Sequence, residues 1–453
     1  MNRRHILKTL PLLCVGPAAF TGAVCAGEDS PRPLCLEYLD RVAAMFAKIR
    51  DTQADMMLEA SYHIARTYGN GGHCFCQWET GHSFDGDMFP DRPGDTDLFI
   101  MGYTMGKPSV EPKSGDLLLV SVLRQPLEDP RALGIFVIGG PTPWCGDTAD
   151  TYLLTEQNRK LRIKPYSDIW IETFIPTLGA IMRLPGETAP VGPTSGALGM
   201  VTYWAMSADA VRILARDKTA VTVKGDEPAL GDNAGYVSPD TPLGARYIDE
   251  CIRQVGQIEA ECGTIETIAR AAADCILSGG KLCVYSRHPE ALSSEANGKR
   301  GGLALINTTF AGDEKFRGTE RDFMIMGIYK PDHETDLAML KKYRSMGMKI
   351  ASIGPATRDG AVPTGVAVPR ETDYHLGYMC DTYGIFAVPG VERKVCPTSG
   401  ILVNLMFWST MIRLAGEIIG RTGTTPGVLS TGAVIGGAEQ RKRRTEVYKV
   451  RGY

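Results

Sequence analysis

A six-residue pattern occurs twice in this chain, and this duplication constrains the fold more than any other feature of the sequence. The first copy is Val191-Gly-Pro-Thr-Ser-Gly196 and the second is Val395-Cys-Pro-Thr-Ser-Gly400. A tryptophan follows each copy at the same distance, Trp204 and Trp408. The separation of about 204 residues is far longer than the period of a solenoid repeat. The sequence therefore predicts a duplicated domain.

The same spacing recurs elsewhere in the chain. Tyr38-Leu-Asp40 corresponds to Tyr247-Ile-Asp249, and Arg92-Pro-Gly94 corresponds to Arg300-Gly-Gly302. A chain of 453 residues is expected to hold about two or three domains, which agrees with a duplication.

Residues 217–242 lie between the two copies and are rich in proline and glycine, which is typical of a linker. We therefore expect a first domain over 34–216 and a second domain over 243–453. The remaining segment at the start of the chain has a different character.

Residues 1–26 have the layout of a secretory signal peptide. Arg3 and Arg4 precede an apolar run, and small residues lead up to Ala26, where cleavage would fall. The paired arginines resemble the twin-arginine export signal of bacteria, so we expect a periplasmic or secreted protein. The run is short and is broken by Pro11 and Pro17, so no membrane span is expected, and an N-terminal anchor is the alternative.

Charge and cysteine content exclude several classes of partner. The net charge of −3 gives no reason to expect nucleic acid or an anionic membrane surface. Most of the 12 cysteines lie in apolar stretches and are interpreted as small buried side chains: Cys251, Cys262 and Cys275 in one helix, and Cys74, Cys76 and Cys283 in strands. Because Cys74 and Cys76 lack a zinc-type spacing and a second ligand pair, we expect no metal and no cofactor.

The first repeat begins with a helical pattern and continues with short apolar runs. Apolar residues recur at three- and four-residue steps over 34–68, which predicts a long amphipathic helix. Strands are expected at 73–78, 97–101, 116–121 and 134–138. Fully apolar runs of this length are typical of a parallel sheet that is covered on both faces.

The second repeat follows the same plan more completely. We expect helices over 247–277 and 334–346, and strands at 281–285, 302–306, 322–326, 348–353 and 383–388. This alternation predicts an α/β fold with two tandem doubly wound parallel sheets. In such sheets the ligand site lies at the carboxyl ends of the strands.

The duplicated Pro-Thr-Ser element stands directly before an apolar run and predicts the start of a buried helix. Thr194, Ser195, Thr398 and Ser399 are expected to cap free amides there, and a helix start favours an anion or a set of hydroxyls. The alternative is a capped core helix that binds nothing, because serine and threonine are preferred caps in any helix.

The order of these elements resembles the SIS domain, the sugar isomerase and phosphosugar-binding fold. The resemblance rests on the long helix, Gly-Gly, the Gly81-His-Ser83 loop, the segment Gly347–Ile353 and the Pro-Gly turn before Pro-Thr-Ser. It extends over 34–453 as two tandem SIS-like domains, and the tail Thr425–Thr431 is similar to an uncharacterised branch. Because SIS domains commonly pair to share sugar sites, the resemblance implies an intramolecular pseudo-dimer and a further homodimer.

The resemblance also implies ligand-binding residues in the loop after the first strand of each repeat. They are Thr80, Gly81, His82 and Ser83 in repeat one, and Ser293 and Ser294, displaced downstream, in repeat two. Repeat one departs from the family at Glu79, where a glycine is expected.

The second phosphate loop of the family has lost its serines in this chain. It reads Gly327-Ile-Tyr-Lys-Pro-Asp-His-Glu-Thr335. Asp332 and Glu334 would repel a dianion unless Lys330 and Arg287 compensate. We therefore expect a neutral or amino sugar, and export points the same way because free sugar phosphates are mostly cytoplasmic.

A sugar isomerase needs a base that moves a proton between neighbouring carbons. The candidates in repeat two are His288 with Glu295, and His333 with Glu334. For each histidine, a structural or solvent-exposed role is the alternative.

Two further histidines are weaker candidates. His82 with Asp87 would serve repeat one. Asp373-Tyr-His375 is placed in a loop before the final strand, from which it could reach the same crevice.

Three functions remain open at this level. The first is an exported carbohydrate-binding protein of the SIS type, an isomerase or lyase acting on a sugar or amino sugar. The second is a non-catalytic sugar-binding protein, and the third is a structural pseudo-dimer that contacts a partner through its loops. Saturable sugar binding separates the first two from the third, and turnover separates the first from the second.

Overall fold

Each repeat contributes one five-stranded parallel sheet to the computed structural model of the chain. Pro33–Tyr453 form one compact unit. Within that unit the structure describes all residues except 77–86, 90, 102–109, 122, 124–127, 141, 143, 188, 226–228, 232–233, 289–291, 297–300, 356–366, 379–383, 430–431, 441, 443–445 and 447–453.

The first sheet has the strand order β2-β1-β3-β4-β5, and neighbouring strands are parallel. Its strands are β1 Cys74–Cys76, β2 Phe99–Met101, β3 Leu117–Val120, β4 Phe136–Gly139 and β5 Ile169–Trp170. These short runs are almost wholly buried, as expected for a parallel sheet with both faces covered.

The second sheet has the order β12-β11-β10-β8-β9, again with parallel neighbours. Its strands are β8 Leu282–Ser286, β9 Ile306–Phe310, β10 Phe323–Gly327, β11 Lys349–Pro355 and β12 Tyr374–Tyr378. Read in the opposite direction, from β9 to β12, this order is the same as that of the first sheet, with β8 in the place of β1 and β10 in the place of β3. The predicted α/β class with two tandem doubly wound sheets is therefore confirmed.

The strand order reverses at the same place in both sheets, between β1 and β3 and between β8 and β10. At such a reversal the connections leave toward opposite faces, and a crevice opens at the carboxyl ends of the two strands. In the second sheet this position is followed directly by Arg287 and His288 after β8 and by Ile328 and Tyr329 after β10.

An aspartate precedes the central strand of each sheet and fixes the neighbouring turn. Asp116 accepts hydrogen bonds of 2.8 Å from the backbone amides of His73 and Lys113. Asp322 accepts the equivalent pair at 2.8 Å in the second repeat. The duplication thus extends to single hydrogen bonds.

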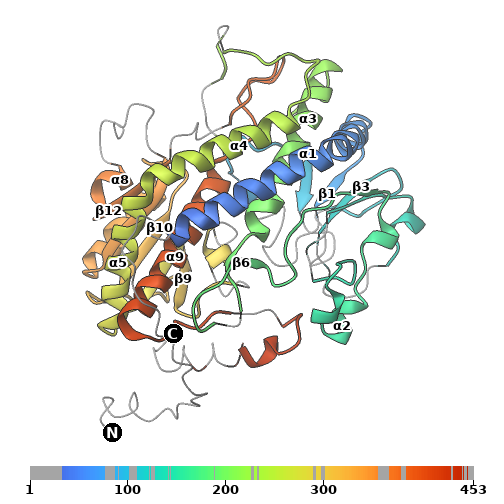
Figure 1. The fold of residues 1–453 in the computed structure, drawn as a ribbon. Coiled ribbons are helices and arrows are strands. Elements are labelled where there is room, and N and C mark those ends of the chain that lie inside the picture. The colour runs from blue at the N-terminus through green and yellow to red at the C-terminus, as the bar shows by residue number, and fades with distance from the viewer. Residues whose placement is uncertain are drawn as a thin grey trace, which may run out of the picture. The chain divides into compact units, whose positions relative to one another are not determined.

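Long helices lie between and beside the sheets. They are α1 Leu34–Gly69, α3 Ser195–Arg216, α4 Gly244–Ile258, α5 Cys262–Leu277, α7 Glu334–Ser345 and α9 Ser399–Thr422. Helix α1 packs against α3, α4 and α9, and α5 packs against α9. Figure 1 shows α1 and α4 side by side, with β1 and β3 toward one end of the pair and β10 and β12 toward the other.

Helices α3 and α9 follow the two Pro-Thr-Ser elements and are buried around most of their surface, as the sequence predicted. They belong to one hydrophobic core that contains residues of both repeats. Among the described residues, Ser399–Thr422 is one helix long and apolar enough to cross a membrane, and 83% of its apolar window is buried in this fold.

Shorter elements connect the main ones. They are the helices α2 Glu156–Arg159, α6 Ser294–Ala296 and α8 Val368–Glu371, the 3-10 helices η3 Pro130–Leu133, η4 Thr151–Leu153, η5 Lys164–Tyr166 and η6 Glu259–Glu261, and the antiparallel pair β6 Ala180–Met182 and β7 Val191–Pro193.

Two predicted strands of the second repeat were wrong. The strand expected at 302–306 is β9, which begins only at Ile306. The strand expected at 383–388 is not in the sheet, because Phe386 forms only an isolated bridge with Val395. The edge strand is β12, so His375 lies in a strand and not in the predicted loop.

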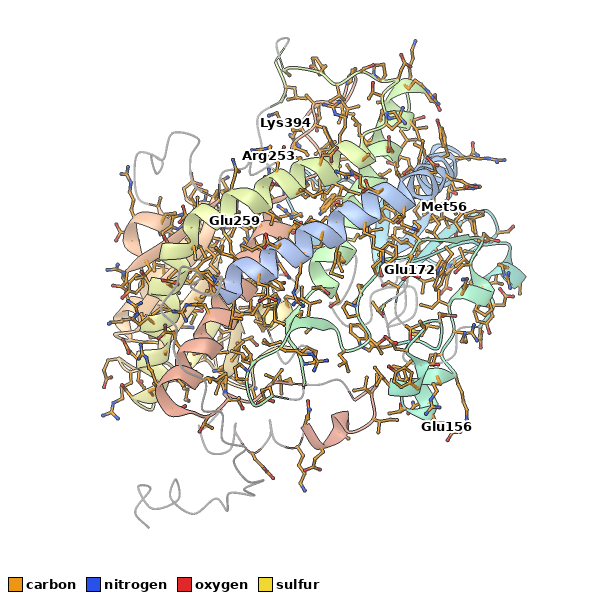
Figure 2. The ribbon with its side chains drawn as sticks, in the orientation of Figure 1. Met56, Glu156, Glu172, Arg253, Glu259 and Lys394 are labelled. Atoms are coloured by element: carbon orange, nitrogen blue, oxygen red, sulfur yellow. The ribbon has the colours of Figure 1, made fainter. Side chains whose placement is uncertain are left out.

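The helix predicted over 247–277 is divided by η6 into α4 and α5. Cys251 therefore lies in a different helix from Cys262 and Cys275, and the latter two are partly exposed. Figure 2 labels Arg253 in α4 and Glu259 at the start of η6. The domain boundaries at 216 and 243 stay predictions.

Candidate functional site

The carboxyl edge of the second sheet gathers charged and aromatic side chains from both repeats. We call them the sheet-edge cluster: Phe89 and Asp91 from repeat one, and Arg287, His288, Tyr329 and Asp336 from repeat two. The second-repeat members follow β8, follow β10 or lie in the first turn of α7. This is the position at which the strand order predicts a ligand site.

Arg287 is the most unusual member of the cluster. Its side chain is 8% exposed, and Nη2 lies 3.3 Å from Oδ2 of Asp91. Its Nε and Nη1 are buried and have no hydrogen-bond partner in the described part of the chain. A guanidinium is always charged and carries five donors, so this one keeps unused donors inside the fold.

His288 lies next to Arg287 and shares its carboxylate. Nε2 of His288 is 2.5 Å from Oδ1 of Asp91, and the imidazole stacks on Phe89 with ring centroids 4.8 Å apart. The His288 ring and then the Arg287 guanidinium lower the pKa of Asp91 to about 2. Asp91 therefore stays ionised and fixes the orientation of the imidazole.

Aromatic rings form one wall of the cluster. Phe89 and Tyr329 are tilted against each other with centroids 5.3 Å apart. The guanidinium of Arg92 lies over both rings, 5.6 Å and 5.0 Å from their centroids. Such contacts stabilise a desolvated cation and leave an apolar surface beside it.

Asp336 supplies a buried carboxyl group. It is 1% exposed, and Oδ1 accepts a hydrogen bond of 2.8 Å from the hydroxyl of Tyr285. Burial raises the pKa of Asp336 to about 6, while Arg287 and the Tyr285 hydroxyl lower it. This group therefore changes its charge near neutral pH.

Behind the sheet edge, two carboxylates join the repeats. We call this region the inter-repeat junction: Asp87, Arg92, Trp204, Glu295, Ser399 and Trp408. Arg92 donates to both oxygens of Asp87 at 2.8 Å and 2.9 Å, and its Nη2 donates to Oγ of Ser399 at 2.8 Å. Since Arg92 also stacks on Tyr329, the junction is continuous with the sheet-edge cluster.

The junction places each carboxylate over a helix start of the other repeat. A Cβ at Gly400, in the first turn of α9, would meet Asp87, and one at Gly196, in the first turn of α3, would lie 3.0 Å from Oε2 of Glu295. The glycine at the fourth position of Pro-Thr-Ser-Gly is therefore needed for the carboxylate to approach. Glu295, predicted as catalytic, is 5% exposed and lies here.

The predicted capping by threonine was wrong. Thr194 and Thr398 occupy the N-cap positions of α3 and α9, but neither makes a side-chain cap. Both Oγ1 atoms are buried and without a hydrogen-bond partner in the described residues. Ser399 accepts from Arg92, and Ser195 is buried beside Thr194. The buried carboxylates, not the hydroxyls, meet the helix starts.

The hydroxyl of Ser293 is used inside its own loop. It donates to the carbonyl of Thr309 at 2.7 Å and accepts from the amide of Ser286 at 2.9 Å. These bonds hold the turn after β8 that carries Arg287. Ser294 begins α6 in the same loop.

His333 lies at the start of α7, where Nδ1 accepts a hydrogen bond of 3.2 Å from the amide of Thr335. It is a helix cap in this structure. Thr80, Gly81, His82 and Ser83, predicted to bind ligand in repeat one, lie outside the described residues. The described residues contain no group of three or more His, Cys, Asp or Glu side chains that could hold a metal ion.

Sequence reasoning identified Arg287 and His288 but not Asp91, Asp336 or Arg92 as parts of one site. Asp91 and Arg92 come from the other repeat, and no local pattern indicates a contact over such a separation. The repeated Arg-x-Gly element around Arg92 was the available signal.

No protein-family model matches the chain, and no curated protein matches it. Solved structures do resemble it. The C-terminal domain of glucosamine-fructose-6-phosphate aminotransferase from Francisella tularensis has a TM-score of 0.45 and 10% identity, over 86% of this chain and 98% of that one. A putative phosphosugar isomerase from Clostridium difficile has a TM-score of 0.45 and 10% identity, over 86% and 94%.

A putative sugar binding protein from Salmonella typhimurium is similar at a TM-score of 0.43 and 10% identity, over 85% of this chain and 99% of that one. At this identity no residue role passes from these proteins to this chain. The function proposed for it therefore rests on the residues of its own site.

Proposed function

We propose that this protein binds a sugar or amino-sugar derivative in the sheet-edge cluster. Arg287 carries the proposal, because it is 8% exposed and its Nε and Nη1 find no partner among the described residues. Leaving a buried charged donor unsatisfied costs about 1–3 kcal/mol or more. A ligand that accepts hydrogen bonds removes that cost.

The rest of the cluster complements a polyhydroxylated ring. Sugar hydroxyls accept hydrogen bonds from Arg287 and donate to the carboxylate of Asp336, while the Phe89 and Tyr329 wall suits the apolar face of a sugar ring. The negative charges of Asp91 and Asp336 would repel a doubly charged phosphate group placed beside Arg287. This arrangement favours a neutral or amino sugar over a phosphosugar.

One buried carboxyl group in the cluster can exchange a proton near neutral pH, and an imidazole lies in the same cluster. Asp336 has a pKa of about 6, and His288 is oriented by Asp91. A base in this range suits transfer of a proton between neighbouring carbons. We therefore propose isomerase or lyase chemistry at this site, and the alternative is a sugar-binding protein without turnover.

The site of action and the assembly also belong to the proposal. We propose that the twin-arginine-like segment exports the folded chain. We also propose a homodimer, because the family resemblance implies that such domains pair. The proposed leader lies outside the described residues.

The binding proposal is tested by thermal unfolding of the full chain against neutral sugars, amino sugars and their phosphates. A ligand at 100 times its dissociation constant adds about 2.7 kcal/mol to the free energy of unfolding. Arg287→Met keeps the side-chain volume and should abolish the shift. The control is Arg131→Met, because Arg131 pairs with Asp129 at an exposed position outside the site.

Turnover is tested with the sugars that bind. In deuterated water an isomerase exchanges a carbon-bound hydrogen next to the carbonyl with solvent, which proton NMR detects. Exchange that His288→Gln abolishes supports catalysis. Binding without exchange favours the non-catalytic alternative, and no shift with any sugar favours the structural pseudo-dimer.

A further inference from the structure

Two cysteine sulfurs from different repeats are far apart in the sequence but lie close together in the fold. Sγ of Cys35 lies 3.6 Å from Sγ of Cys262, and 227 residues separate the two. Cys35 is in the first turn of α1, and Cys262 is the first residue of α5. Cys35 is fully buried and Cys262 is partly exposed.

Two other described thiols donate to backbone carbonyls instead. Sγ of Cys74 donates to the carbonyl of Ile64, and Sγ of Cys275 donates to that of Arg321. Cys35 and Cys262 differ from cysteines that are merely buried in an apolar core, because their two sulfurs lie against each other.

We propose that Cys35 and Cys262 form a disulfide that fastens the start of α1 to α5 when the protein meets an oxidising environment. A disulfide needs the sulfurs at about 2.05 Å, so they must approach by roughly 1.5 Å. Cys35 lies in the first turn of α1, where the backbone adjusts more easily than inside a helix, and Cys262 lies where η6 passes into α5. This proposal is independent of the sugar site.

The reaction is thiol–disulfide exchange with a small or protein-borne disulfide as oxidant. The thiolate of Cys262 attacks one sulfur of that disulfide, a mixed disulfide forms, and one thiol leaves. The thiolate of Cys35 then attacks Sγ of Cys262 and expels the second thiol. Two protein thiols lose two protons and two electrons, and the oxidant disulfide becomes two thiols.

Exposure decides which cysteine reacts first. Cys262 reaches solvent and accepts the oxidant, whereas Cys35 is enclosed. Burial raises the pKa of the Cys35 thiol to about 12, and Cys262 beside it acts in the same direction. Closure by Cys35 should therefore be the slow step, with a rate that rises about tenfold per pH unit between pH 7 and 9.

The bond would close a very long loop between the repeats. Joining two distant points of the chain lowers the conformational entropy of the unfolded state, and this effect grows with loop length. The oxidised protein should thus unfold at a higher denaturant concentration than the reduced protein. An exported protein would gain this bond after leaving a reducing compartment.

The test incubates the full chain, first reduced, with oxidised glutathione, blocks remaining thiols with an alkylating agent and maps peptides by mass spectrometry. We expect a linked Cys35–Cys262 peptide with a mass two hydrogens lower. In Cys35→Ala, glutathione should remain on Cys262, and in Cys262→Ala, Cys35 should stay a thiol. Buried Cys74 and Cys283 serve as internal controls and should remain unmodified until the protein is unfolded.

A second readout keeps the proposal testable if a variant is unstable. The denaturant midpoint of the wild type should fall when dithiothreitol is added, and the midpoint of Cys262→Ala should not change. Glutathione that persists on Cys262 of the wild type, or a reductant-dependent midpoint that survives in Cys262→Ala, would overturn the proposal.

Discussion

The indole Nε1 of Trp408 donates a hydrogen bond of 3.1 Å to Oε1 of Glu295. Trp204 donates an equivalent bond of 3.1 Å to Asp87 in the other repeat. Each carboxylate therefore binds the helix of its own repeat through a tryptophan and lies against the helix start of the other repeat. The duplicated Pro-Thr-Ser-Gly pattern and its tryptophan mark this reciprocal contact.

Removing either indole donor should destabilise the protein by a similar amount. Trp408→Phe and Trp204→Phe each leave a buried carboxylate with one donor fewer, which should lower the free energy of unfolding by about 1–3 kcal/mol. Denaturant unfolding measures this change. Trp170→Phe is the control, because Trp170 is half-buried and lies outside the junction. An effect in only one of the two variants would contradict the reciprocal role.

Gly400 should tolerate no side chain. In Gly400→Ala the new Cβ would meet the carboxyl group of Asp87, which is held by Arg92 and Trp204 and cannot move away easily. Overpacking of this kind costs about 1–3 kcal/mol. Gly420→Ala, in the same helix, has nothing within 4 Å of its Cβ and should be neutral or stabilising. Equal midpoints for the two variants would refute the close approach.

The duplication and the class of doubly wound parallel sheet could be predicted because they depend on local patterns. Apolar runs and glycine turns marked β8, β10 and β11 close to their observed positions. Strand β12 was missed because Tyr374-His-Leu-Gly-Tyr378 is not an apolar run. It is an edge strand, which needs less burial than the central ones.

From the sequence, only site residues that lie within a single loop could be predicted. Arg287 and His288 followed from their position after β8, but their partner Asp91 is brought in by the docking of the two repeats. Threonine capping was wrong at Thr194 and Thr398, where no side-chain cap forms and a carboxylate of the facing repeat lies against the first turn of the helix. Long-range contacts of this kind have no signature in a single sequence.

Asp336 should make the stability of the protein depend on pH between about 4 and 6. Its pKa of about 6 lies above the value of 3.8 for an exposed aspartate, so the unfolded chain ionises first as pH rises. The free energy of unfolding should therefore fall by an amount on the order of 3 kcal/mol across this window and level off above pH 6. Asp336→Asn should remove this slope.

Urea midpoints at several pH values measure the difference between wild type and Asp336→Asn. Asp332→Asn is the matched control, because Asp332 is exposed in the turn before the same helix. A wild-type stability that rises relative to Asp336→Asn between pH 4 and 6 would mean that the electrostatic attraction of Arg287 for Asp336 outweighs the effect of burial.

We expect Ser293 to stabilise its loop and not to contact the ligand. Ser293→Ala breaks the bonds to Thr309 and Ser286, and the buried partners it leaves unsatisfied should cost about 1–3 kcal/mol of unfolding free energy. Because the hydroxyl is already used, affinity for any sugar that stabilises the wild type should change less than twofold when measured well below the unfolding temperature. Ser278→Ala, at the exposed end of α5, is the control for stability. A variant of normal stability with lost sugar affinity would instead return Ser293 to the ligand-binding role that the family resemblance implies.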